Sequence, residues 1–89
     1  MRCVISVLGK DTTGIVANIA TVLAECKANI DDISQTILDG LFSMTMLVTL
    51  NEDVAPFDDV QDRLAQVSEE IGVQITLQRQ DVFDYMYKI

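Results

Sequence analysis

The feature that most constrains the fold is a hairpin signal at Asp39 and Gly40. This dipeptide suits a type I′ turn, in which both central residues need a positive φ. The segment after it, 41–50, alternates between apolar and polar side chains with the period of a strand that has one buried face. Its apolar positions are Phe42, Met44, Met46, Val48 and Leu50. The segment before it, 30–38, is also rich in β-formers, so the sequence predicts two antiparallel strands over 30–38 and 41–50.

A helical period predicts a helix over 12–27, because Ile15, Ile19 and Leu23 recur every four residues. Three side chains could cap its start by accepting free backbone N–H groups, namely Asp11, Thr12 and Thr13. Asn29 is expected to end this helix, since Asn tolerates the left-handed conformation. A second helix is predicted from Pro56 to residue 71, with Gly72 as its end.

Short β-rich segments at 2–8 and 73–79 complete the order β-α-β-β-α-β. This order predicts an α+β fold, a ferredoxin-like βαββαβ sandwich in which two helices cover one face of a four-stranded antiparallel sheet with strand order 4-1-3-2. The length indicates one domain over 1–89, and the apolar tail 81–89 is expected to dock as a tail or short helix. The second sheet face is expected to stay open. Its expected polar residues are Ser6, Ser34, Gln35, Thr36, Ser43, Thr45, Thr49 and Thr76.

The charge balance argues against polyanionic partners. Six basic and fourteen acidic residues give a net charge of −8, whereas nucleic-acid affinity comes largely from Lys and Arg that neutralise phosphates. Anionic membranes are disfavoured for the same reason. The sequence contains no apolar run of about 18 residues and no signal-peptide pattern at its start. A cytoplasmic location is expected, where Cys3 and Cys26 would be reduced thiols.

The chain lacks the usual machinery of catalysis. It contains no histidine, which removes the commonest general base and metal ligand. Cys3 and Cys26 form no C-x-x-C pair and are better explained as core thiols, and Met44 and Met46 as core packing. No P-loop, dinucleotide fingerprint, nucleophile elbow or calcium loop is present. The sequence therefore predicts no enzymatic activity, no cofactor and no metal.

Two segments resemble ACT domains. Residues 9–17, GKDTTGIVA, are similar to the D-x-x-G-[ILV] loop that opens these domains, and residues 28–35, ANIDDISQ, are similar to their junction between first helix and second strand. The resemblance covers nearly the whole chain. It is closest to the small stand-alone ACT proteins of bacteria and archaea and more distant to the glycine-cleavage regulators. Thr13 stands where many ACT loops have proline, which makes the turn before Gly14 looser.

The resemblance implies a non-catalytic, allosteric regulatory module. It would bind an amino acid at a homo-oligomer interface, where the first loop of one subunit faces the second strand of its neighbour. The expected partners are a second copy of the chain, as a homodimer or larger assembly, an amino acid, and a regulated protein. A ligand-free adaptor for oligomerisation or protein interaction is the alternative.

The residue chemistry of these segments suits such a site. Gly14 lets a ligand approach the backbone closely, and the first N–H groups of a helix can receive a carboxylate. The candidate ligand-binding residues are Asp11, Thr12, Gly14, Ile15, Val16, Asn29, Asp31, Asp32, Ser34 and Gln35. Simpler roles stay open. Asp11 or Thr12 could be a helix cap only, Gly14 could serve packing, and Asp31 and Asp32 could be charges that protect an edge strand from aggregation.

Overall fold

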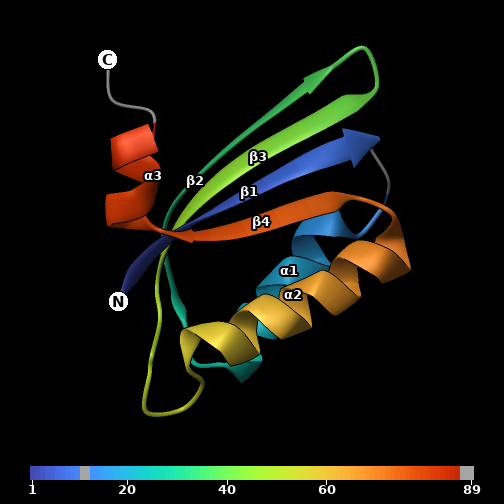
Figure 1. Ribbon diagram of the computed structural model, residues 1–89. Helices are drawn as coiled ribbons and strands as arrows, with labels where there is room; N and C mark the ends of the chain where they lie inside the picture. The colour runs from blue at the N-terminus through green and yellow to red at the C-terminus, as the bar shows by residue number, and fades with distance from the viewer. Residues whose placement is uncertain (11–12, 87–89) are drawn as a thin grey trace.

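The computed structural model describes residues 1–10 and 13–86, which form the predicted sandwich (Figure 1). The elements are β1 (Arg2–Lys10), α1 (Ile15–Glu25), β2 (Asn29–Leu38), β3 (Leu41–Thr49), α2 (Phe57–Ile71), β4 (Gln74–Arg79) and α3 (Gln80–Met86). The strands pair antiparallel in the order β2-β3-β1-β4. This is the predicted order read from the other edge, so β2 and β4 are the edge strands.

The predicted hairpin is confirmed. Asp39 and Gly40 both adopt positive φ, 51° and 79°, as a type I′ turn requires. The turn brings Leu38 opposite Leu41 and sets the register of the two strands.

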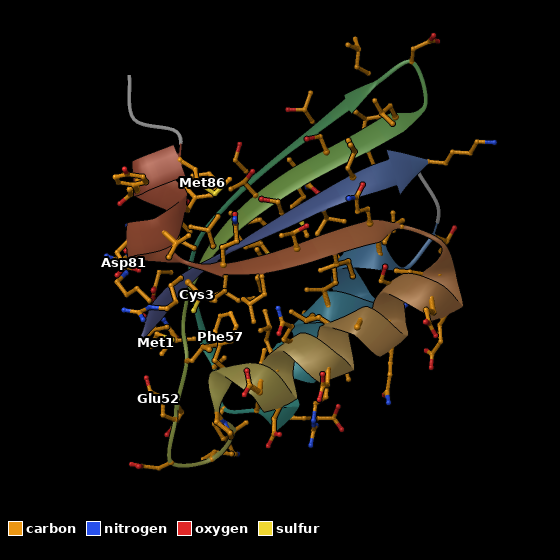
Figure 2. The ribbon with its side chains drawn as sticks, viewed as in Figure 1. Met1, Cys3, Glu52, Phe57, Asp81 and Met86 are labelled. Carbon is orange, nitrogen blue, oxygen red and sulfur yellow. The ribbon has the colours of Figure 1, made fainter. Side chains whose placement is uncertain are left out.

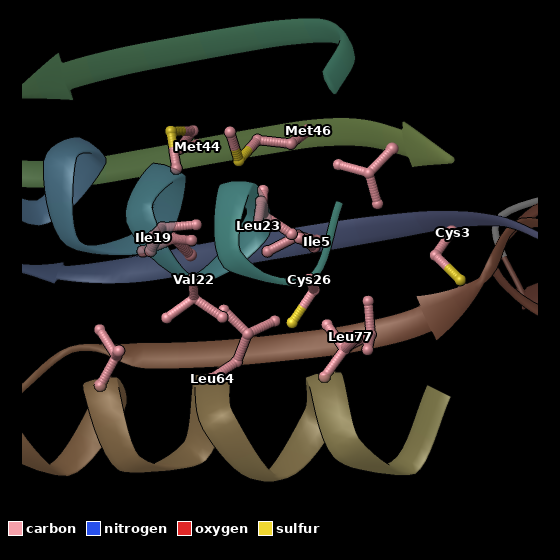
Figure 3. Close-up of a cluster of buried hydrophobic side chains, with 14 of the residues drawn as sticks. Cys3, Ile5, Ile19, Val22, Leu23, Cys26, Met44, Met46, Leu64 and Leu77 are labelled. Atoms are coloured by element: carbon pink, nitrogen blue, oxygen red, sulfur yellow. The ribbon is translucent and has the colours of Figure 1, made fainter. Parts of the chain in front are cut away.

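The core lies between the sheet and the pair α1 and α2 (Figure 3). Alternate residues of β1 and β3 supply one side of it, and the apolar stripes of the two helices supply the other. Its members include Cys3, Ile5, Val7, Ile19, Leu23, Cys26, Met44, Met46, Leu64 and Leu77. The interpretation of both cysteines and both methionines as core residues is confirmed.

Both predictions for the ends of α1 need correction. Gly14 is the N-cap residue, with a left-handed φ of 88° and no side-chain cap bond, so Thr13 is not the cap; Asp11 and Thr12 lie outside the described residues. At the other end, Lys27 takes the left-handed φ of 58°, and the N–H of Ala28 donates to the Leu23 carbonyl at 2.9 Å. That bond closes the helix as a Schellman motif, whereas Asn29 already belongs to β2.

A β-bulge interrupts the register of β2 between Ile30 and Asp32, where Asp31 is the extra residue. An extra residue reverses the faces of all side chains beyond it. Ser34 and Thr36 therefore lie opposite Thr45 and Ser43 on the face away from α1 and α2. Gln35 lies opposite the core residue Met44, so the prediction that it belongs to the open face is wrong.

Helix α3 packs on β1 and β4 on the face opposite α1 and α2 (Figure 1). The Gln78 amide donates to the sulfur of Met86 at 3.4 Å, and Arg79 forms an ion pair with Asp81 at 3.0 Å. Val4 alternates away from the core and is still only 1% exposed, because α3 covers it. The expectation of an open second face is therefore wrong for the part beneath α3. Of the tail 81–89, residues 87–89 lie outside the described residues.

Candidate functional site

Two groups of the predicted site residues lie at opposite ends of the sheet within one chain, Asn29 and Asp31 at one end and the start of α1 at the other. Arg2 and Asn29 both pair with Thr49 at one end, whereas Lys10 pairs with Leu41 at the other. Gly14 follows the second end. The nine residues of β1 separate the two ends by about 27 Å, at about 3.4 Å per residue. A single chain therefore does not bring Asn29 and Asp31 to the start of α1.

The start of α1 presents backbone donors. The carbonyl of Gly14 accepts both the backbone N–H of Asn18 at 2.9 Å and the side-chain amide of Asn18 at 2.7 Å. The N–H groups of Ile15, Val16 and Ala17 precede the first helical hydrogen bond, so they have no acceptor within the helix. A Cβ on Gly14 would meet the Asn18 Nδ2 atom at 3.3 Å. The start of α1 therefore favours glycine at position 14. Its first N–H groups can donate hydrogen bonds to an acceptor group.

Asp31 is the centre of a polar cluster at the other end. Its Oδ1 accepts from the Asn29 amide at 2.6 Å, its Oδ2 accepts from the Thr49 hydroxyl at 2.6 Å, and the Arg2 Nε lies 3.7 Å from Oδ2. The hydrogen bond from Thr49, then that from Asn29 and the charge of Arg2, lower the pKa of the Asp31 carboxyl. Asp31 is thus a carboxylate at neutral pH that links β2, β3 and β1.

Asp32 and Ser34 lie apart from that cluster, in a cavity of about 290 Å³ beneath α3. The N–H of Ile33 donates to the Asp32 Oδ1 at 2.8 Å. The remaining lining residues are Val4, Ile33, Thr45, Leu47, Gln80, Phe83 and Asp84. The sequence reasoning missed the α3 residues of this cavity, although the apolar side chains in the tail indicated a docked element. Figure 2 shows the side chains of Asp81 and Met86 on the same helix.

The edge strand β2 carries an exposed apolar stripe on the side that faces the helix layer. Ile30, Ile33 and Ile37 lie opposite the buried residues Val48, Met46 and Phe42, and are 39%, 43% and 57% exposed. Gln35 lies in the same row. An edge strand with unpaired backbone groups and exposed apolar side chains is a template for pairing with another chain.

Within residues 1–10 and 13–86 no helix is long and apolar enough to cross a membrane. The part of the chain that the structure describes also holds no cluster of three or more His, Cys, Asp or Glu side chains arranged for a metal ion.

The family model for the ACT domain matches residues 2–78. The chain belongs to the ACT domain family. Family members are regulatory modules that bind small molecules and commonly form oligomers.

Relatives of this ACT domain include a UPF0237 protein from Methanocaldococcus jannaschii, which is 51% identical over 99% of this chain and 98% of its own. An ACT domain protein from Streptococcus pneumoniae has the same fold, with a TM-score of 0.79, 37% identity and 98% coverage of both chains. The regulatory subunit of aspartate kinase from Thermus thermophilus is similar at a TM-score of 0.66 and 28% identity, with 86% of this chain and 50% of that chain covered. The expected likeness to small stand-alone ACT proteins is confirmed. A putative glycine cleavage system transcriptional repressor shares the fold at 19% identity, a TM-score of 0.79, and coverage of 89% of this chain and 45% of that chain.

Proposed function

We propose that this ACT domain is a non-catalytic regulatory module that binds an amino acid at an interface between two copies of the chain. The observation that carries the proposal is the exposed isoleucine stripe on the edge strand β2, Ile30, Ile33 and Ile37. A second copy that pairs along this edge would bury the stripe and satisfy the outer backbone groups of β2.

Pairing of two β2 strands about a two-fold axis would also bring together the predicted site residues that lie far apart within one chain. In an antiparallel pair, the Asn29 end of one strand lies next to the Leu38 end of the other. Because Leu38, Leu41 and Lys10 share one end of the sheet, the loop before α1 of one copy comes to the Asn29 end of its partner. The interface thus unites groups that one chain keeps about 27 Å apart.

The chemistry of the united groups suits an amino acid. The N–H groups of Ile15 and Val16 can receive the carboxylate of the ligand, supported by the helix dipole. The charged Asp31 and the amide oxygen of Asn29 are available to the ammonium group. Asp11 and Thr12 remain candidates in the loop, and Gln35 is a candidate for contact with the partner because it lies in the isoleucine row.

A regulatory output follows from the position of the ligand. A ligand that binds only the assembled form shifts the equilibrium toward assembly, because it can favour only the state to which it binds more tightly. Membership of the ACT family and the absence of histidine support a role without catalysis. The regulatory subunit of aspartate kinase, half of which is similar to this chain, has a name that assigns it a regulatory role.

The proposal is tested by calorimetric titration of the purified protein with each of the twenty amino acids, together with light scattering after size exclusion. At least one amino acid is expected to bind and to increase the dimer fraction. Gly14→Ala is expected to abolish this binding. Gly40→Ala is the matched control, since Gly40 also has a positive φ, 79°, but lies in the hairpin turn. Twenty flat titrations, or a strict monomer at high concentration, would contradict the proposal.

A ligand-free adaptor is the second candidate, and one observation favours it. Each oxygen of Asp31 already accepts one hydrogen bond, from Asn29 or from Thr49, and the Arg2 Nε lies 3.7 Å away, so the carboxylate is partly compensated within the chain. For an adaptor, dimerisation is expected without any amino acid bound, and Gly14→Ala would leave assembly unchanged.

A further inference from the structure

The cavity beneath α3 is formed within one chain. Its floor is on the sheet, at Val4, Thr45 and Leu47, and its walls come from β2 and α3. It lies on the face opposite α1, so it is separate from the start of α1, and it shares one lining residue, Ile33, with the isoleucine stripe. Its volume of about 290 Å³ is at the lower limit of ligand pockets in proteins, which run from about 300 to 1,000 Å³. A ligand for it must be small.

The floor offers apolar contact. Val4 is 1% exposed although it lies outside the main core, and Leu47 lies directly opposite it in β3. Phe83 of α3 lines the same space. Val4 itself is covered, so the apolar surface open to a short aliphatic group comes from Leu47 and Phe83, which are half-buried.

The walls carry negative charge. Asp32 comes from β2 and Asp84 from α3, and Ser34 of β2 and Thr45 of β3 add hydroxyl groups to the lining. The nearby cations are engaged elsewhere, because Arg2 lies against Asp31 and Arg79 pairs with Asp81. Neither Asp32 nor Asp84 has an ion-pair partner among the described residues. The hydrogen bond from the N–H of Ile33 holds Asp32 by Oδ1 and leaves Oδ2 for a ligand.

We propose that this cavity binds a small aliphatic amine in its ammonium form. The ammonium group lies between the carboxylates of Asp32 and Asp84 and donates to the hydroxyl oxygens, while the carbon chain packs on Leu47 and Phe83. Two carboxylates in the lining of one cavity, in a chain of net charge −8, favour a cation over a neutral or anionic ligand. A calcium ion would need about six to eight oxygen ligands and would make no use of the apolar floor.

Binding of such an amine would add a link between two elements whose backbones lie apart. The backbone of α3 runs close to β1 and β4 but not to β2. A ligand held by Asp32 and Asp84 bridges β2 to α3, so it is expected to slow amide hydrogen exchange in α3 as well as to bind.

The test is a series of ¹H–¹⁵N spectra of the full chain titrated with n-butylammonium chloride. Two matched probes separate the contributions: n-butanol has the same chain without charge, and sodium butyrate has the opposite charge. Saturable shifts are expected for the amides of Asp32, Ile33, Ser34 and of α3 with n-butylammonium only. Asp32→Asn and Asp84→Asn should each weaken binding by about two- to fivefold, as for a partly exposed ion pair. Asp62→Asn, the same change on the exposed side of α2, should have no effect.

Several results would overturn the proposal. These are equal shifts with n-butanol, shifts confined to the start of α1, or an affinity that neither Asp32→Asn nor Asp84→Asn changes. The dispersion of the spectra verifies that each variant is folded. If a variant does not fold, the comparison of the three probes on the natural chain still tests whether binding requires the ammonium charge.

Discussion

The hydroxyl of Thr49 donates to the Asp31 Oδ2 at 2.6 Å, although 18 residues separate them in the sequence. The bond fastens the bulge of β2 to the end of β3. Because it stabilises the ionised carboxylate, it is the first cause of the lowered pKa of Asp31.

Stability should therefore depend on Asp31 at acid pH. When the folded state lowers a carboxyl pKa, the stabilisation is full above the unfolded value, here 3.8, and is lost as the pH falls through the folded value. Asp31→Asn is expected to lower Tm at pH 7. The Tm difference from the natural chain is expected to shrink as the pH falls from about 5 to about 2. Thr49→Val should raise the pKa of Asp31, measured by carboxyl-carbon NMR. Asp62→Asn is the control, and a Tm difference independent of pH for Asp31→Asn would contradict the prediction.

Replacing Gly14 or Gly40 by alanine should lower the free energy of unfolding by similar amounts. Both have left-handed φ angles, 88° and 79°, which cost an L-residue about 1–2 kcal/mol. The Cβ at Gly14 also meets the Asn18 amide at 3.3 Å, whereas that at Gly40 meets nothing. Urea unfolding is expected to give at least as large a loss for Gly14→Ala. An unchanged midpoint for either variant would show that the backbone relaxes without cost.

Gly9→Ala should be destabilising for a different reason, a steric one. A Cβ at Gly9 would lie 2.8 Å from the Cγ1 of Val73, a residue that is 4% exposed. Overpacking of this kind typically costs about 1–3 kcal/mol. A double-mutant cycle with Val73→Ala, which removes Cγ1, should show partial rescue; strictly additive losses would exclude the clash as the cause.

Ile37→Lys should weaken dimerisation while the monomer stays folded. Ile37 is 57% exposed on the β2 edge, so a lysine there is accepted by the isolated chain but is costly in an interface. Sedimentation equilibrium is expected to show a rise in Kd of about tenfold, equivalent to about 1.4 kcal/mol. Val54→Lys makes the same change at a residue that is 52% exposed in the loop before α2, and should leave Kd unchanged.

Cys3 should react slowly with thiol reagents. It is fully buried, and this desolvation raises the pKa of its thiol, which lowers the thiolate fraction at pH 8. Labelling with iodoacetamide, followed by peptide mass spectrometry, is expected to modify Cys3 only after unfolding in guanidinium. Rapid labelling of the native chain at Cys3 would contradict this.

The elements of the fold could be predicted because their signals are local. The positive φ of Asp39 and Gly40, the alternation of Met44 and Met46, and the stop at Gly72 depend on neighbours within a few residues. The resemblance of the loop at 9–17 indicated the family for the same reason. These signals are enough to order the strands, because short connections leave few ways to join them.

Tertiary contacts determine which side chains line the cavity beneath α3 and which join the isoleucine row. The bulge at Asp31 reverses the faces of β2, so Ser34 faces the cavity while Gln35 joins the isoleucine row, and alternation alone does not reveal an extra residue. Helix α3 brings Asp84 to the cavity that Asp32 lines, although more than fifty positions separate them in the sequence. The sequence by itself determined which helices and strands form. Only the packed structure decided which side chains meet, because the register and the docking of α3 depend on contacts between residues far apart in the chain.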